Sequence, residues 1–132
     1  MGDRPRPTIL LVDDDPLVAA LAQDALALEG YRVVLVHNHA QALVAIAAVR
    51  FRLVLTDTGA GAVPGSPTMW ADLGRIREAA GTTPTVLFSA HHPTLLAGHH
   101  ERGFAGVIAK PFDLDALLET VRRLIDRDWA AA

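Results

Sequence analysis

Three consecutive carboxylates, Asp13, Asp14 and Asp15, directly follow the largely apolar run 8–12. A short run without polar alternation is typical of a strand that is buried on both faces. Two unit charges about 4 Å apart repel by roughly 1 kcal/mol in water and by about 4 kcal/mol near a protein surface. Such a cluster at the end of a buried strand therefore calls for a compensating cation.

Other side chains capable of chemistry also stand directly after short apolar runs: Asp57 after 53–56, Ser89 after 85–88 and Lys110 after 106–109. Two carboxylates and water can hold Mg²⁺, which prefers oxygen ligands. A third carboxylate, Asp57, could attack phosphorus and form an acyl phosphate. The Lys110 ammonium and the Ser89 hydroxyl could then neutralise or hydrogen-bond the transferring oxygens.

The elements that must position these residues follow a strand-then-helix pattern. The sequence predicts strands at 8–12, 32–36, 53–56, 85–88 and 106–109. Helices are expected from Pro16 to Gly30 behind an Asp15 cap, from Asn38 to about Val49, over 69–79, weakly from about Pro93 to before Gly103, and after an Asp113 cap with fraying beyond Asp128. Residues 58–68 hold three glycines and two prolines, and are expected to form a loop.

Five strand-then-helix units predict an α/β fold in which one parallel sheet carries helices on both faces, joined by right-handed crossovers. In such sheets the ligand site lies beyond the carboxyl ends of the strands. Asp13, Asp14, Asp57, Ser89 and Lys110 would all meet at that edge. We expect a single domain over 1–132, with its core at about 8–127 and no output domain in the chain.

The composition narrows the class of protein. The chain is 51% hydrophobic and 20% charged, which is typical of a globular domain and not of a disordered one. A net charge of −3 gives no support for direct nucleic-acid contact. No apolar run approaches the roughly 18 residues of a membrane span, and the absence of cysteine suits a reducing compartment. We expect a cytoplasmic protein without a membrane partner.

Together these residues resemble the receiver domain of two-component response regulators, the CheY-like family. The similarity extends from Ile9 to about Asp126, and includes the stretch 103–106 followed by Lys110-Pro111-Phe112. The resemblance implies a (βα)5 flavodoxin-like, doubly wound sheet with strand order 2-1-3-4-5. It also implies self-catalysed phosphoryl transfer and autodephosphorylation rather than a conventional enzyme.

The resemblance assigns a role to each residue of the constellation. Asp13 and Asp14 match the acidic metal-binding pair, and Asp57 matches the phosphorylated aspartate, which is also a metal ligand. Gly59 matches the position that binds the metal through its backbone carbonyl. Ser89 and Lys110 match the hydroxyl and the lysine before proline. The implied cofactor is Mg²⁺, with Mn²⁺ as a possible substitute, and Asp15 is left as a helix cap.

Some positions depart from the family pattern. Gly61 stands where a proline is usual, so the loop after Asp57 is expected to be more mobile. Val107 occupies the position of an aromatic switch in many members, which predicts weak or altered switching. His91, two residues after Ser89, would border the phosphoryl group and modulate the access of water to it.

The favoured function is a receiver that takes a phosphoryl group from the phosphohistidine of a sensor histidine kinase or phosphotransfer protein onto Asp57. It would signal through an unidentified downstream protein, and a homodimer is possible. Three alternatives stay open: a phosphatase resembling the haloacid-dehalogenase superfamily with Asp13 as nucleophile and Asp15 as acid-base, a phosphorylation-independent interaction domain, and a receiver fragment of a hybrid kinase. The phosphatase leaves Asp57 unexplained and finds Pro16 where its pattern requires threonine or valine.

Overall fold

The computed structural model describes residues 6–59, 61–89, 96–110 and 113–131, with side chains described as far as Ile125. Its five strands are β1 (Thr8–Val12), β2 (Arg32–Val36), β3 (Leu53–Thr56), β4 (Thr85–Ser89) and β5 (Gly106–Ala109). Its helices are α1 (Pro16–Leu28), α2 (His39–Ala48), α3 (Pro67–Ala80) and α4 (Leu114–Ala131). The strands form one parallel sheet in the order β2-β1-β3-β4-β5, which confirms the predicted fold class and strand order.

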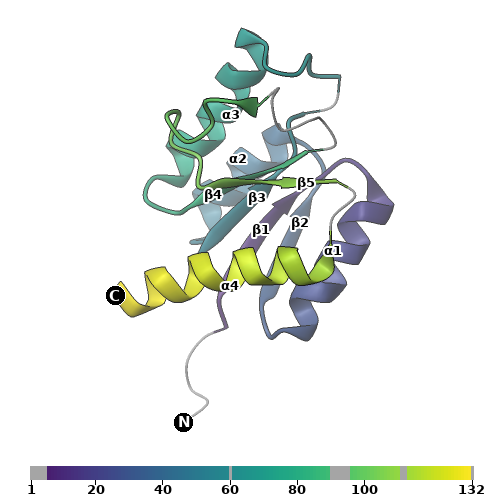
Figure 1. The fold of residues 1–132 in the computed structure, drawn as a ribbon, viewed down its shortest axis with the longest axis vertical. Helices are drawn as coiled ribbons and strands as arrows, with labels where there is room; N and C mark the ends of the chain where they lie inside the picture. The colour runs from purple at the N-terminus through teal and green to yellow at the C-terminus, as the bar shows by residue number, and fades with distance from the viewer. Residues whose placement is uncertain (1–5, 60, 90–95, 111–112, 132) are drawn as a thin grey trace.

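Helices cover both faces of the sheet (Figure 1). Because successive residues of a strand point to opposite faces, alternate residues of the central strands pack against different helices. Ile9 and Leu11 of β1 belong to a core with residues of α1 and α4, whereas Leu10 and Val12 belong to a second core with residues of α2 and α3. All four of these side chains are fully buried. A strand buried on both faces needs apolar residues at every position, which is why β1 reads as a continuous apolar run.

Local signals fix where the helices begin. The Asp15 side chain accepts hydrogen bonds from the backbone N–H groups of Leu17 and Val18, at 3.0 and 3.3 Å, which confirms its role as a cap. Asn38 caps α2 by accepting from the N–H of Gln41 at 2.8 Å. These caps set the first turn of each helix at the carboxyl edge of the sheet.

The bounds of two helices differ from those expected. Helix α3 begins at Pro67, two residues before the predicted start, because Ser66 caps it and proline is tolerated in the first helical turn. The last helix continues to Ala131 rather than fraying after Asp128. The loop before α3 is correspondingly shorter than predicted.

The helix expected between about Pro93 and Gly103 is not found in the part of this segment that the structure describes. Pro93 itself lies outside the described residues, and 96–103 form successive turns instead of an α-helix. Gly98 and Gly103 both have positive φ, at 87° and 92°, a conformation that interrupts a helix. Leu96 is fully buried with Leu87 and Phe104, and this contact anchors the turns against the sheet.

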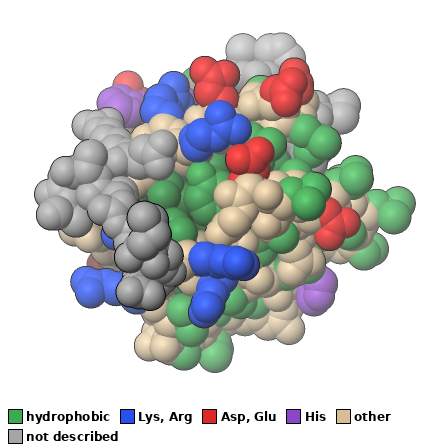
Figure 2. All heavy atoms as spheres, turned by 90° about the horizontal axis from the view of Figure 1, so that it is seen from below, with side chains coloured by type: hydrophobic (Ala, Val, Ile, Leu, Met, Phe, Trp, Pro, Cys, Tyr) green, Lys and Arg blue, Asp and Glu red, His purple; other side chains and the backbone are tan. Residues whose placement is uncertain are grey.

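Within the described residues, no helix is both long enough and apolar enough to cross a bilayer. On the face seen in Figure 2, acidic and basic side chains are interspersed with apolar ones. No single sign of charge dominates that face. The expectation of no direct nucleic-acid contact stays a prediction.

Candidate functional site

Three carboxylates meet at the carboxyl edge of the sheet. One oxygen of each of Asp13, Asp14 and Asp57 lies within 4.8 Å of the other two. Asp13 and Asp14 follow β1, and Asp57 follows the adjacent strand β3, so parallel pairing brings them together. Asp13 is fully buried and Asp57 is 6% exposed, whereas Asp14 faces solvent. The site is an acidic pocket with an open side at Asp14.

The charge of Asp13 is matched by a lysine. Lys110 Nζ lies 2.7 Å from Asp13 Oδ2, and only 14% of the lysine side chain is exposed. The other oxygen, Oδ1, accepts a hydrogen bond of 2.9 Å from the N–H of Asp15. Lys110 therefore pairs with Asp13 in this structure, and its role on transferring oxygens stays a prediction.

The Asp57 carboxylate is held from three sides. Its Oδ1 accepts from the N–H of Gly59 at 3.2 Å and lies 3.3 Å from His39 Nε2, while Oδ2 accepts from the N–H of Asp14 at 3.3 Å. Burial by itself would raise the pKa of Asp57, but the hydrogen bonds from His39 and Asp14, with the positive charges of His39 and Lys110, outweigh it and lower that pKa. Asp57 is thus held as a carboxylate.

The neighbouring Asp14 shows the opposite shift. Desolvation and the negative charge of Asp57 raise its pKa above the ordinary value. A bound cation would relieve both this repulsion and that between Asp14 and Asp13. Oxygen ligands in this number suit a hard divalent ion such as Mg²⁺, so the residues present fit the metal that the sequence predicts.

The remaining predicted site residues differ in their burial and in their hydrogen-bond partners. Ser89 ends β4, is 2% exposed, and accepts the backbone N–H of Lys110 at 2.7 Å through its carbonyl. The Gly59 carbonyl accepts from the N–H of Ala62 at 3.2 Å, so metal binding through it stays a prediction. Val107 is half-buried against the cluster of Met69, Trp70, Leu73, Leu87, Leu96 and Phe104. His91 lies outside the described residues.

Sequence reasoning missed His39. Its Nε2 lies 3.2 Å from the Asp57 backbone oxygen and 3.3 Å from Oδ1, which makes it a direct neighbour of the predicted nucleophile. The sequence contains part of the signal for His39, because Asn38 predicts a helix that starts at the same edge of the sheet as the acidic cluster. The direction of the side chain could not be read from that pattern.

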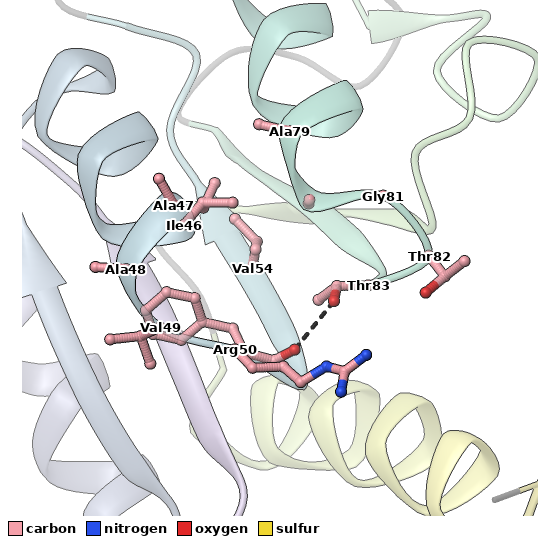
Figure 3. A pocket seen from close by; sticks show the side chains of 12 residues that line it. Ile46, Ala47, Ala48, Val49, Arg50, Val54, Ala79, Gly81, Thr82 and Thr83 are labelled. Atoms are coloured by element: carbon pink, nitrogen blue, oxygen red, sulfur yellow. Dashed lines mark hydrogen bonds between the residues drawn. The ribbon is translucent and has the colours of Figure 1, made fainter.

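A hollow of about 400 Å³ lies at the opposite edge of the sheet, between the ends of α2 and α3 (Figure 3). Its wall includes a hydrogen bond of 3.0 Å from the Thr83 hydroxyl to the Phe51 carbonyl. The lining has no carboxylate and no histidine: it consists of residues 46–51, Val54 and residues 79–83. It is therefore separate from the acidic pocket and offers no acid–base chemistry of its own.

Comparisons with known proteins show the family to which this fold belongs. The family model described as "Response regulator receiver domain" matches residues 9–122. The uncharacterized transcriptional regulatory protein YkoG of Bacillus subtilis is 33% identical over 116 residues, which are 86% of this chain and 49% of that protein. The DNA-binding response regulator MtrA of Mycolicibacterium smegmatis is 32% identical over 127 residues, covering 96% of this chain and 54% of that protein.

A further relative is of another kind: the sensor histidine kinase AruS of Pseudomonas aeruginosa is 32% identical over 113 residues, which cover 83% of this chain and 11% of the kinase. The chain thus spans about half the length of YkoG and MtrA, and far less of AruS.

Solved structures show the same fold. A response regulator from Thermotoga maritima has a TM-score of 0.79 at 28% identity, covering 92% of this chain and 99% of that one. A CheY-like receiver domain protein from Methanospirillum hungatei has a TM-score of 0.83 at 20% identity, covering 97% and 100%. The matched residues 9–122 include the whole acidic pocket. The chain belongs to the family of two-component response-regulator receiver domains.

Proposed function

We propose that Asp57 is the phosphoacceptor of this receiver domain, and that Asp13, Asp14 and Asp57 bind the Mg²⁺ on which the reaction depends. The observation that carries the proposal is the different state of the carboxylates at one edge. Asp57 is buried and kept ionised, beside an exposed acid whose pKa is raised. An ionised oxygen next to a cation site is what an attack on phosphorus requires.

In the proposed reaction, an Asp57 oxygen forms a bond to phosphorus while the bond from phosphorus to a donor imidazole nitrogen breaks. The donor is the phosphohistidine of a sensor histidine kinase or phosphotransfer protein. Bound Mg²⁺ would supply charge neutralisation for the phosphoryl oxygens. Lys110 and Ser89, which stand at the carboxyl ends of β5 and β4, would stabilise the same charge.

Autodephosphorylation hydrolyses the bond between phosphorus and Asp57. Water attacks phosphorus, the bond between phosphorus and the Asp57 oxygen breaks, and inorganic phosphate leaves while the carboxylate re-forms. Both steps use the same residues, so the domain works as a timed signal and not as a conventional enzyme. We propose that a downstream protein, or a segment beyond this stretch of sequence, reads the phosphorylated state.

The structure gives no support to Asp13 as a phosphatase nucleophile. Its Oδ2 is paired with the Lys110 ammonium at 2.7 Å and its Oδ1 accepts from the N–H of Asp15 at 2.9 Å, both shorter than the 3.2–3.3 Å contacts of the Asp57 oxygens. Asp15, the acid-base group of that alternative, faces the N–H groups of α1 as its cap. Asp57 is the carboxylate with the arrangement that phosphoryl transfer needs.

The test is to identify which residue carries the acyl phosphate. The protein is incubated with acetyl phosphate and Mg²⁺, and the modified aspartate is trapped and located by mass spectrometry. We expect the label on Asp57, dependence on Mg²⁺, and its loss in Asp57→Asn. Asp24→Asn, a change at an exposed acid of α1, should leave labelling unchanged. Label on Asp13, or labelling that survives Asp57→Asn, would overturn the proposal.

A further inference from the structure

The first residue of α2, His39, lies against the predicted phosphoacceptor. Its Nε2 approaches two atoms of Asp57: the carboxylate Oδ1 at 3.3 Å and the backbone oxygen at 3.2 Å. The His39 side chain is 18% exposed and that of Asp57 is 9% exposed, so water is largely excluded from the contact. In such surroundings a hydrogen bond to an ionised group is stronger than it is in water.

The contact fixes where the imidazole carries a hydrogen. Both oxygens that face Nε2 can only accept, because Asp57 is ionised and a carbonyl has no proton to give. Nε2 therefore donates, and the hydrogen bond to Asp57 exists in the neutral ring with its proton on Nε2 as well as in the imidazolium. The hydrogen bond from His39 therefore does not require a change in the charge of the ring.

The neighbouring loop leaves room for the ring. Gly59 has a φ of +100°, and a Cβ atom at this position would lie 3.2 Å from His39 Cε1. A larger residue would be strained in this backbone conformation and would press on the imidazole. The N–H of Gly59 also donates to Asp57 Oδ1, so His39 and Gly59 together occupy that oxygen. Oδ2 accepts from a single backbone N–H, that of Asp14, so we assign the bond to phosphorus to Oδ2 and metal binding to Oδ1 beside its two donors.

Building on the proposed phosphorylation of Asp57, we infer that His39 hastens the loss of the phosphoryl group by donating its Nε2 hydrogen to the departing carboxylate. His39 touches an atom of the reacting group, and beside the backbone N–H of Gly59 it supplies a side-chain donor to Oδ1. The residue would set the lifetime of the signal.

The charge on Asp57 explains the direction of the effect. In the acyl phosphate, Oδ1 is a neutral carbonyl oxygen and accepts only weakly. When water attacks phosphorus and the bond to Oδ2 breaks, negative charge returns to the carboxylate and is shared by both oxygens. The transition state is loose, so most of this charge has already developed when it is reached. A donor on Oδ1 is therefore stronger in the transition state than in the acyl phosphate.

The forward reaction should respond differently. Before phosphorylation the carboxylate is fully charged, and in a loose transition state it has lost little of that charge. The donor then stabilises the starting state and the transition state almost equally, so its removal changes the rate of phosphorylation little. A residue that merely held Asp57 in place would affect both directions together. This asymmetry distinguishes the two roles.

The experiment compares His39→Leu, which has no donor, with His39→Gln, whose side-chain amide can present N–H near the position of Nε2. Each variant is phosphorylated with acetyl phosphate and Mg²⁺, and the acyl phosphate is quantified by mass spectrometry during formation and, after removal of the donor, during decay. We expect His39→Leu to decay roughly tenfold more slowly than the wild type, the difference between a charged and a neutral hydrogen bond. Its formation rate should stay within about twofold.

His39→Gln should recover most of the wild-type decay rate. His100→Leu, which removes an exposed histidine in the turns 96–103, is the matched control and should match the wild type in both directions. Far-UV circular dichroism checks that each variant folds. Should His39→Leu be unfolded, His39→Asn serves as the variant whose amide is too short to reach Asp57.

The outcomes separate this inference from the proposed function. Unchanged decay in His39→Leu, or formation and decay slowed by the same factor, would overturn the role of His39 while leaving Asp57 as phosphoacceptor. Failure of His39→Gln to restore decay would overturn it as well. A wild-type protein that forms no acyl phosphate would overturn the proposed function, and the role of His39 with it.

Discussion

The pair formed by Lys110 and Asp13 allows a demanding test of how the acidic pocket is stabilised. The change is Lys110→Met, which keeps an unbranched side chain and removes the charge. Asp13 has no exposed surface, and Lys110 Nζ lies 2.7 Å from its Oδ2. The variant would leave a fully buried carboxylate without its cation, in a cluster with the carboxylates of Asp14 and Asp57.

The magnitude follows from what remains around Asp13. Removal of one partner of a buried ion pair costs about 3–5 kcal/mol. Asp13 keeps its hydrogen bond from the N–H of Asp15, and the open side of the pocket at Asp14 admits water, so the lower end applies. We expect the free energy of unfolding to fall by about 3 kcal/mol without metal. For a domain of this length that corresponds to a Tm lower by roughly 10 °C.

The assay is urea unfolding, followed by circular dichroism, in EDTA and in excess Mg²⁺. Ligands that bind only the folded state stabilise it. A cation in the pocket would take over part of the charge compensation, so Mg²⁺ should stabilise Lys110→Met more than the wild type. Adding Asp13→Asn to Lys110→Met should recover stability, because the uncompensated carboxylate is then gone.

The matched control is Arg75→Met. Arg75 and Asp72 are 3.8 Å apart on α3 with side chains 72% and 47% exposed, and such a pair contributes at most about 1 kcal/mol. The reasoning would be refuted by a Lys110→Met variant that, in EDTA, loses no more stability than Arg75→Met. A double variant no more stable than Lys110→Met would contradict it too.

Three further predictions concern the same edge of the sheet. Asp14→Asn should raise the free energy of unfolding of the metal-free protein by a few tenths of a kcal/mol after solvent screening, because the raised pKa of Asp14 reflects a charge that destabilises the fold at neutral pH. The same change should abolish stabilisation by Mg²⁺. A loss of stability in EDTA would contradict this prediction. His39→Leu should lower the free energy of unfolding of the metal-free protein most between pH 3.8 and 6.5, the ordinary pKa values of Asp57 and His39. The stabilisation from the raised pKa of His39 is lost as pH rises, and that from the lowered pKa of Asp57 is lost as pH falls. Equal losses of stability in unfolding curves at pH 5 and pH 9 would exclude this. Asp15→Ala should lower stability by about 1 kcal/mol through loss of the α1 cap, with an unchanged gain from Mg²⁺, as calorimetry with and without the metal would show.

The strands could be predicted from the sequence because each one is a short apolar run with polar residues at its ends. The bounds of β1, β2, β3 and β5 agree with the prediction, and β4 includes one residue more, Ser89. The bounds of the helices were harder to predict, because a proline can belong either to a loop or to the first turn of a helix. The number of glycines and prolines around Pro67 predicts a loop, yet behind the Ser66 cap Pro67 is the first residue of α3.

The segment before β5 shows a different limit. The sequence predicts a weak helix that ends before Gly103, but the described residues 96–103 form turns held in place by the buried Leu96. Local propensity cannot reveal such a tertiary contact. At Gly103, a Cβ atom would lie 2.9 Å from Arg77 Cδ, so close packing against α3 adds to the conformational reason for glycine.

For the site, parallel pairing alone brings Asp13 and Asp14 next to Asp57, because adjacent strands end at the same edge. The sequence could not predict the partner of Lys110, since strand order places it near the pocket without choosing among the carboxylates. Nor could it predict His39, which comes from the helix after β2. That contact depends on the packing of α2 against the sheet and on a side-chain rotamer, neither of which residue spacing determines.

The four carboxylates at this edge differ in their surroundings, and this difference explains why one of them would react. Asp15 accepts the N–H groups of a helix, and Asp13 is bound by Lys110 and a backbone N–H. Asp14 is exposed with a raised pKa, which suits a metal ligand that gains from a cation. Asp57 is buried, as Asp13 is, but it is kept ionised by longer contacts of 3.2–3.3 Å to both of its oxygens. The proposed selectivity for Asp57 therefore rests on the partners of each carboxylate and not on their shared chemistry.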